Sequence, residues 1–346
     1  MSKKIIISVS MLLLGTLSFG AQTPLEKALP LLQKHQRTAA EDQRVLQLFR
    51  SSDDNDVIFA AGASLVKNPP AKVQEPALLS VLLRTSNPLK QTFAAVILTA
   101  MGSAYEELTP TLLNALSGQD TVLRAYGAAA YALIHPEDKT YTDDIIRLYA
   151  FDPEFSQRAL NALTENQTQL FQFVSKASAA SQASTRAAAA AWLGKQHSQE
   201  AAKLLLKRAK RETDSAVSTQ LAIALAKNRD LTFAQTAKGL HRNYKTPQSA
   251  TYALALGFMT GNAVDILRRG LTDKNTHVRI NSARAAAYMA GVLSTPDGFV
   301  YSQDRAFDTL LLKGLIAPLK ALAASGTADE QTYAKNALSQ IEKLME

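Results

Sequence analysis

Residues able to cap a helix recur along this chain at a nearly constant interval. Each stands just before an Ala-rich stretch, and the first eight are 27 to 34 residues apart. Proline directly follows Asn87, Asp152 and Thr246, and it suits the first position of a helix, where its missing N–H would have no partner. A steady period of this size is typical of stacked-repeat proteins. The nine candidate caps are Asp53, Asn87, Asp120, Asp152, Ser181, Asp214, Thr246, Asp273 and, after a longer interval, Thr327.

Every interval combines two stretches in which apolar residues are three and four positions apart. Leucines dominate the stretch before a cap, as at 112–116, and alanines dominate the stretch after it, as at 121–133. This spacing places an apolar stripe on one face of a helix. A single pair of such helices cannot bury both stripes, so neighbouring pairs must stack. The sequence therefore predicts an all-α fold, a right-handed α-solenoid of about nine two-helix repeats over residues 40–346.

Two segments resemble a HEAT-type repeat. Segment 266–290 has leucines, then Asp273 at the turn, then Val278 and Arg279, then small residues, and segment 112–133 follows the same order. The resemblance implies an α-solenoid that serves as an interaction scaffold. HEAT-like repeats also occur in lyases that handle bilin pigments, an activity that this composition does not support. A basic residue near the start of the second helix is supplied by Lys90, Arg124, Arg186 and Arg279.

The first 20 residues resemble an export signal. Two lysines precede an apolar run over residues 5–17, and Ser18 and Gly20 are small residues at the −3 and −1 positions of a cleavage site. The alternative is an uncleaved anchor, but the run is short for the roughly 20 residues of a membrane span. We therefore expect a signal peptide at 1–20 and an exported mature chain that is not transmembrane and resides in a bacterial periplasm.

Two further segments depart from the regular repeat. Residues 21–39 are amphipathic and predict an N-terminal capping helix, because terminal repeats need an altered outer face. Residues 293–307 lack helical periodicity and predict an insertion in the solenoid. Phe299 and Tyr301 of this insertion either fold back onto the stack or contact a partner.

Charge is divided unevenly along the chain. Residues 21–166 carry a net charge of −4, whereas residues 167–346 carry +10. Three basic clusters near the ends of consecutive first helices predict a basic ridge. Such cations either complement helix dipoles and solvate the outer face, or form an electrostatic platform for an anionic lipid, polymer or acidic protein. Export argues against a nucleic-acid partner. The ridge comprises Lys207, Arg208, Lys210, Arg211, Arg242, Lys245, Arg268 and Arg269.

The residues that usually carry catalysis are scarce. The chain has no cysteine and only five histidines, so it lacks disulfides, thiolate nucleophiles and Cys-type zinc sites. The motifs HExxH, GxSxG, GxGxxG and GxxxxGK[ST] are all missing. We therefore expect that the chain is not an enzyme and that it holds no cofactor and no metal.

The first predicted function is a non-enzymatic scaffold or adaptor of the bacterial cell envelope. It would bind a protein or peptide on the concave surface that the second helices line. The alternative is docking on an anionic surface through the basic ridge. Trp192, alone in an Ala-rich stretch, is predicted to fill the core between repeats. The candidate contacts on the concave surface are Arg124, Tyr126, Arg158, Arg186 and Arg284.

Overall fold

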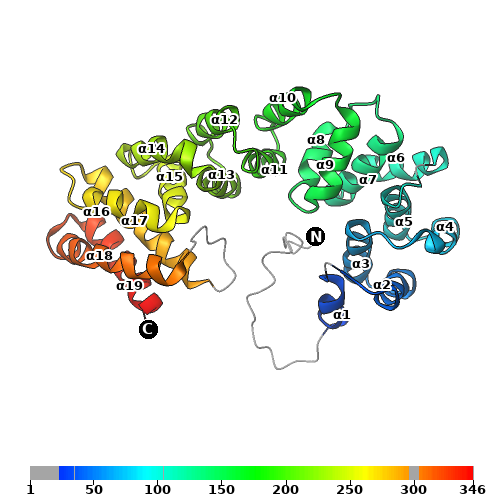
Figure 1. The fold of residues 1–346 in the computed structure, drawn as a ribbon, viewed down its shortest axis with the longest axis horizontal. Coiled ribbons are helices and arrows are strands. Elements are labelled where there is room, and N and C mark those ends of the chain that lie inside the picture. Colours follow the sequence, from blue (N-terminus) through cyan, green and yellow to red (C-terminus); the bar gives the residue numbers. More distant parts are fainter. Residues whose placement is uncertain (1–22, 35, 104, 296–303, 346) are drawn as a thin grey trace. The chain divides into compact units, whose positions relative to one another are not determined.

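The computed structural model describes residues 23–34, 36–103, 105–295 and 304–345. Over these residues every regular element is helical, with nineteen α-helices joined by turns and short 3-10 helices (Figure 1). This confirms the predicted all-α fold class. The chain divides into two compact units, Met1–Phe173 (unit 1) and Val174–Glu346 (unit 2), and each is described by itself.

Helix pairs follow one another through both units. After the single helix α1, each even-numbered helix (an A helix) leads through a short turn into an odd-numbered helix (a B helix). In unit 1 the helices are α1 (Pro24–Leu32), α2 (Ala39–Ser51), α3 (Asn55–Lys67), α4 (Glu75–Arg84), α5 (Pro88–Ala100), α6 (Thr109–Ser117), α7 (Thr121–Ile134), α8 (Thr142–Leu148) and α9 (Pro153–Leu163). Helix α10 (Gln167–Ala177) crosses the boundary between the units.

The pairs continue through unit 2. Its helices are α11 (Ala183–Leu193), α12 (Gln199–Ala209), α13 (Ser215–Lys227), α14 (Arg229–Lys238), α15 (Pro247–Phe258), α16 (Val264–Leu271), α17 (Thr276–Ser294), α18 (Arg305–Ser325) and α19 (Ala328–Met345). Successive B helices pack on one another, from α3 to α9 in unit 1 and from α11 to α19 in unit 2. The nine pairs in the described part of the chain agree with the predicted number of repeats.

Capping side chains start most of the B helices. The predicted cap accepts a backbone N–H hydrogen bond at Asn87, Asp120, Asp152, Asp214, Thr246 and Thr327. The other three predictions are wrong by one or two residues, because a neighbouring residue takes the cap position. Asp54 caps α3 in place of Asp53, Asn275 caps α17 in place of Asp273, and Gln182 precedes α11 in place of Ser181.

An aromatic cluster joins the four B helices of unit 1. Phe59 of α3, Phe93 of α5, Tyr126 of α7 and Phe155 of α9 contribute its rings. The Phe93 centroid lies 5.3 Å from those of both Phe59 and Tyr126, and the Tyr126 centroid lies 6.5 Å from that of Phe155. Helix α3 also contacts α9, three pairs further along the chain. The B helices of unit 1 therefore converge on one shared core.

Smaller residues separate the B helices of unit 2. Trp192 is 2% exposed, which confirms its predicted place in the core. Elsewhere alanine and glycine allow close helix approach. A Cβ atom added at Gly257 of α15 would lie only 2.7 Å from the Cβ atom of Tyr288 in α17. These two B helices therefore meet backbone to backbone.

The two irregular segments are only partly described. Helix α1 lies within the predicted capping segment 21–39 and contacts α2 and α3. The predicted signal peptide, Phe299 and Tyr301 lie outside the described residues.

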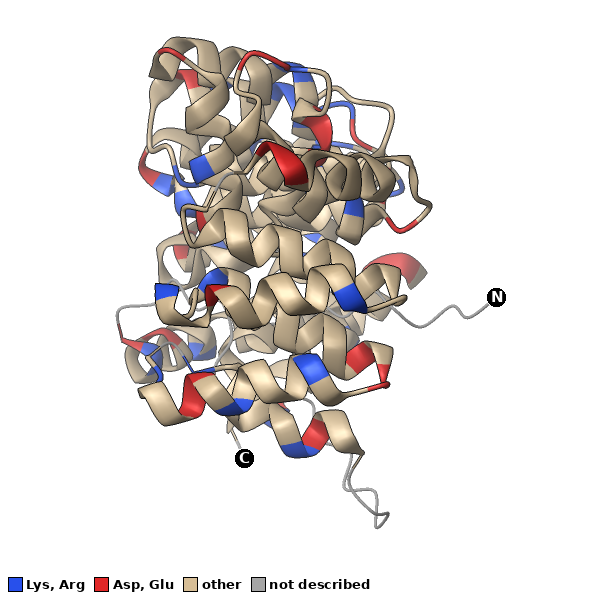
Figure 2. Ribbon diagram, turned by 90° about the vertical axis from the view of Figure 1, so that its right-hand side faces the viewer, with Lys and Arg blue, Asp and Glu red and all other residues tan. Residues whose placement is uncertain are grey.

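Among the helices that are described, none is both long and apolar enough to cross a bilayer. In Figure 2, Lys and Arg segments and Asp and Glu segments are interspersed along the ribbon.

Candidate functional site

The basic residues near the starts of B helices tie neighbouring helix pairs together. Arg186 donates to Glu212 from Nε (2.9 Å) and from Nη2 (3.0 Å). Arg279 donates from the same two nitrogens to one oxygen, Oε1, of Glu330 in the next pair, at 2.9 and 2.6 Å. Weaker versions of this tie are Arg124 with Asp144, at 3.1 Å, and Lys90 with the carbonyl oxygen of Arg50, at 3.1 Å. We call the four basic side chains the tie residues.

The acids of these ties are buried. Glu212 is 8% exposed and Glu330 is 2% exposed. Burial acts to raise the pKa of Glu212, but hydrogen bonds from Arg186 and from two backbone N–H groups outweigh it and hold the pKa below its ordinary value. The pKa of Glu330 is lowered for the same reason, because Arg279 and the Thr327 N–H outweigh its burial. The candidate contacts Arg124 and Arg186 are thus engaged within the chain.

The other candidates of unit 1 also contact their own chain. Tyr126 is 3% exposed and belongs to the aromatic cluster, and burial, followed by the charge of Asp152, raises the pKa of its hydroxyl. A ring so deeply buried offers a partner no surface, so Tyr126 is a core residue. Arg158 of α9 donates to the carbonyl oxygens of Ala100 (2.7 Å) and Thr99 (3.3 Å) at the end of α5.

The predicted basic ridge follows the ends of the A helices in unit 2. Arg208 lies in the last turn of α12, Arg268 in the last turn of α16, and Arg242 directly after the 3-10 helix η4 (Gly239–His241). Each has a partner within the chain: the Ser178 hydroxyl at 2.9 Å, Asp265 at 3.0 Å and the Tyr252 ring at 5.4 Å, respectively. The exposed members are Lys207, Lys210, Arg211, Lys245, Arg268 and Arg269.

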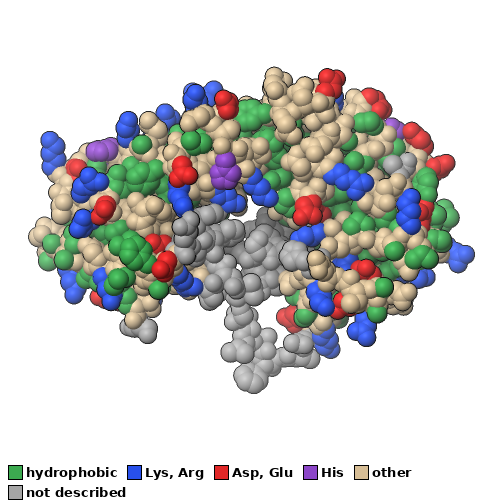
Figure 3. All heavy atoms as spheres, in the orientation of Figure 1, with side chains coloured by type: hydrophobic (Ala, Val, Ile, Leu, Met, Phe, Trp, Pro, Cys, Tyr) green, Lys and Arg blue, Asp and Glu red, His purple; other side chains and the backbone are tan. Residues whose placement is uncertain are grey.

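Acidic side chains interrupt the charged surface as well. On the face shown in Figure 3, the Lys and Arg side chains of unit 2 are spread out, with Asp and Glu side chains between them. The ridge therefore presents fewer free cations than the sequence predicted. As a binding surface it stays a prediction.

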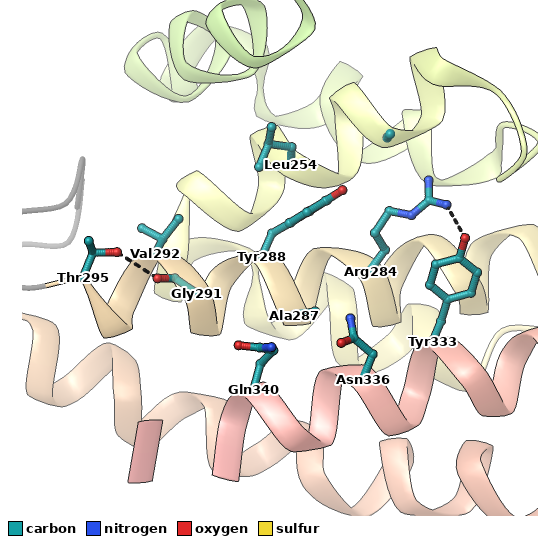
Figure 4. Close-up of a pocket in the computed structure, with 11 residues that line it drawn as sticks. Leu254, Arg284, Ala287, Tyr288, Gly291, Val292, Thr295, Tyr333, Asn336 and Gln340 are labelled. Atoms are coloured by element: carbon teal, nitrogen blue, oxygen red, sulfur yellow. Dashed lines mark hydrogen bonds between the residues drawn. The ribbon is translucent and has the colours of Figure 1, made fainter. Parts of the chain in front are cut away.

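A groove opens on the B-helix face of unit 2, and Arg284 lines it (Figure 4). Its volume is about 640 Å³. The lining positions of α17 and of α19 are three and four residues apart, so each helix contributes one continuous face. We call it the B-helix groove. It is lined by Ala250 and Leu254 of α15, by Arg284, Ala287, Tyr288, Gly291, Val292 and Thr295 of α17 and its C-cap, and by Tyr333, Asn336 and Gln340 of α19.

Neutral groups hold Arg284 in place. Its Nη2 donates to the Tyr333 hydroxyl at 2.8 Å, and its Nη1 lies 3.4 Å from Ser249 Oγ. Its guanidinium carbon lies 4.9 Å from the centroid of the Tyr333 ring, which is cation–π distance. Within the described residues no carboxylate forms a salt bridge with Arg284, although Arg279 of the same helix has Glu330. The groove thus contains an oriented guanidinium whose charge no carboxylate of the described segments neutralises.

Amide and apolar side chains line the rest of the groove. Asn336 and Gln340 lie one turn apart on α19, and Leu254 and Val292 line the groove from α15 and α17 (Figure 4). A Cβ atom added at Gly291 would meet nothing within 4 Å, so the space above this turn of α17 is open.

The sequence prediction missed the contribution of α19. One signal could have revealed it: Tyr333, Asn336 and Gln340 are three and four residues apart, so they share one face of a B helix. Alanine holds many positions on this face in other B helices, so polar and aromatic residues stand out here. In the segments that the structure describes, no cluster of three or more His, Asp or Glu side chains could hold a metal ion.

Comparisons with known proteins give matches only among solved structures. No family model matches the chain, and no curated protein matches it. Among solved structures it is similar to the complex of CpcE and CpcF of phycocyanin lyase from Nostoc sp. PCC7120, with 16% identity and a TM-score of 0.27. The match covers 94% of this chain and 99% of that chain.

One expectation from the sequence is corrected here. We expected a chain with this pattern and no familiar catalytic motif not to be an enzyme. The matched structure is that of a lyase, so the prediction that the chain is not an enzyme does not stand. The absence of short motifs does not exclude enzymatic activity.

Proposed function

We propose that this chain is a helical-repeat scaffold that binds an extended protein segment in the B-helix groove. The observation that carries the proposal is Arg284, which lies in an open groove, is oriented by neutral groups and has no acidic partner among the described residues. Binding sites combine apolar lining with a few placed polar groups, and this groove has that composition. Residues 284 to 295 of α17 and its C-cap span about 16 Å, which accommodates about five residues of extended chain.

We also propose that the scaffold acts in the bacterial cell envelope after export. This part rests on the sequence alone, through the signal-peptide pattern at residues 1–20. Fractionation of cells that produce the tagged chain tests it. Recovery of the uncleaved chain in the cytoplasm would contradict export.

A pair of glycine variants tests the groove. Gly291→Leu fills it, whereas Gly314→Leu places the same side chain on α18, away from the groove. An added Cβ meets nothing within 4 Å at either position, so both variants should fold. Protein captured by the tagged wild-type chain from envelope extracts should be lost with Gly291→Leu and kept with Gly314→Leu.

Salt separates the groove from the basic ridge. Binding through exposed cations weakens as ionic strength rises, because salt screens exposed charges. Capture in the groove should persist at high salt. Capture that both leucine variants retain, and that high salt abolishes, would overturn the groove and favour the ridge.

A further inference from the structure

Arg284 lies at one end of the B-helix groove. The remaining lining residues of α17 follow Arg284 along the chain, and those of α19 follow Tyr333. In Figure 4, Arg284 and Tyr333 stand together, and Thr295 and Gln340 lie toward the opposite end. The guanidinium is therefore a terminal feature of the groove rather than a central one.

Packed side chains close this end. The Tyr333 ring covers the guanidinium of Arg284 and makes an edge contact with the Tyr244 ring, with a centroid distance of 6.2 Å. The Tyr244 hydroxyl is held in turn by Asp329. Ser249 Oγ, which lies beside Arg284, bonds to the Tyr244 carbonyl oxygen at 3.0 Å. A chain that lies along the groove must therefore end, or turn outward, at Arg284.

Arg284 has the charge and the free donors that a carboxylate requires. A guanidinium carries five N–H donors in a planar fork that matches a carboxylate. The contacts to Tyr333 and Ser249 engage two of the nitrogens, one of them weakly at 3.4 Å. Arg279 shows the contrasting case, because its carboxylate partner, Glu330, comes from the chain itself. No carboxylate of the described residues supplies the matching charge at Arg284, so a ligand could supply it.

The body of the groove suits the backbone of an extended chain. The Cβ atoms of residues four apart on a helix lie roughly 6 Å from each other, and an extended chain advances roughly 6.6 Å every two residues. Asn336 and Gln340 have this spacing, and their amides both donate and accept hydrogen bonds. Leu254 and Val292 on the opposite side offer apolar contact to a side chain.

We propose that the B-helix groove takes the last residues of an extended protein chain and holds its C-terminal carboxylate on Arg284. This inference rests on the proposed function, because it specifies which part of a protein the groove binds.

The test uses a pentapeptide library with a fluorophore at the N-terminus, prepared once with free C-terminal carboxylates and once as C-terminal amides. Both forms are selected on the immobilised full chain, and affinities of the enriched peptides are measured by fluorescence anisotropy. We expect the free acids to bind at least about tenfold more tightly than the matching amides, because a charge-assisted hydrogen bond is lost on amidation.

Variants identify the side chain responsible. Arg284→Gln retains a donor for Tyr333 but no charge. With this variant, free acids and amides should bind about equally. Arg284→Lys restores the charge without the fork and should recover part of the preference. Gly291→Leu should abolish binding of both forms, and Gly314→Leu should leave both unchanged. The comparison of acid and amide on the wild-type chain needs no variant, so it stands even if Arg284→Gln impairs folding.

The outcomes separate the two proposals. Equal binding of acids and amides, blocked by Gly291→Leu, overturns recognition of the C-terminus and leaves the groove as a peptide site. Selection of amidated peptides with an internal Asp or Glu, lost with Arg284→Gln, also overturns it, because the carboxylate then comes from a side chain. Binding that Gly291→Leu does not reduce overturns the proposed function itself.

Discussion

The B helices of both units stack on one another, but those of unit 1 enclose a packed aromatic core whereas those of unit 2 border an open groove. In unit 1, rings from four successive B helices meet in the aromatic cluster, and α3 contacts α9. In unit 2, Ala250, Ala287 and Gly291 stand on α15 and α17, where a groove of about 640 Å³ opens. The volume of a few side chains on the B helices therefore decides whether a stack of helix pairs is packed shut or left open.

The arginines divide in a similar way. Arg186 and Arg279 lie near helix starts and bind buried acids of the next pair. Arg284 lies five residues after Arg279, and its partners are a tyrosine and a serine. The arginine near the helix start thus holds neighbouring repeats together, whereas Arg284, further along its helix, supplies a charge to the open groove.

The largest expected effect comes from removing a ring of the aromatic cluster. Phe93→Ala should lower the free energy of unfolding by about 3–5 kcal/mol, because Phe93 is fully buried among other rings. Leu254→Ala at the half-buried groove wall should cost about 2 kcal/mol or less, since its side chain is incompletely buried. Urea unfolding followed by circular dichroism measures both. Equal losses would contradict the contrast between a closed and an open face.

Breaking a tie should cost less than removing Phe93 but more than changing Arg284. Glu330→Ala leaves Arg279 without its carboxylate, and we expect a loss of about 3 kcal/mol, at the low end for buried pairs because Arg279 is partly exposed. Arg284→Gln leaves no carboxylate unpaired and should cost about 1 kcal/mol or less, the loss of a cation–π contact. The same unfolding assay compares them. A larger loss for Arg284→Gln would show that Arg284 is a structural residue.

The pH dependence of the ties has a definite sign. The pKa of Glu330 is lower in the folded chain than its ordinary value of 4.5. The unfolded chain therefore binds more protons in this window, so stability falls as pH drops below about 4.5 toward the folded pKa. Glu330→Gln should flatten this part of the pH profile, as measured by thermal unfolding between pH 3 and 6. If Glu330→Gln left the slope of stability against pH unchanged, the loss of stability at low pH would be due to other acids.

Two glycines of the B helices α15 and α17, only one of which lines the groove, provide a finer contrast. Gly257→Ala places its Cβ atom 2.7 Å from that of Tyr288 and should cost about 1–3 kcal/mol through overpacking. Gly291→Ala points into open space and should stabilise α17 by about 0.5–1 kcal/mol, the helix propensity difference. Shifts in Tm measure both effects. Destabilisation by Gly291→Ala would mean that the groove is closed at this turn.

The smallest effect concerns the cap Asp152 in unit 1. Burial raises the pKa of this carboxyl above 3.8, and within the described residues its Oδ2 has no hydrogen-bond partner. The folded chain then holds the proton more tightly, so this carboxyl costs stability as pH rises through the folded pKa. Asp152→Asn keeps the cap and should raise stability at pH 7 by about 1 kcal/mol or less. Asp120→Asn changes an exposed cap of the same kind, and an equal gain there would refute burial as the cause.

The sequence predicts the local structure well because its signals are local. Caps such as Asn87 and Asp214 mark helix starts through hydrogen bonds to N–H groups two or three residues away. The errors at Asp53 and Asp273 arise because several polar residues adjoin each of these turns, and spacing alone does not choose among them.

The candidate site is less predictable because its contacts are distant in sequence. Arg124, Arg186 and Arg284 look alike in the sequence, and only the fold shows which of them meets an acid. Glu330 reaches Arg279 across 51 residues, and Tyr333 reaches Arg284 across 49. The groove depends on the register between α17 and α19, which helical periodicity within one repeat does not specify.

The ties limit how such a chain changes its length during evolution. Arg186 and Glu212 belong to successive pairs, as do Arg279 and Glu330, and Gln248 donates to the carbonyl oxygen of Glu212 from the pair that follows. Losing a single helix would leave a buried acid or its arginine without a partner, so we expect duplication and deletion to be tolerated mainly as whole modules with matching ends. The same constraint applies to engineered truncations: a shortened protein must keep both the arginine and the acid of each tie, or replace both with apolar residues.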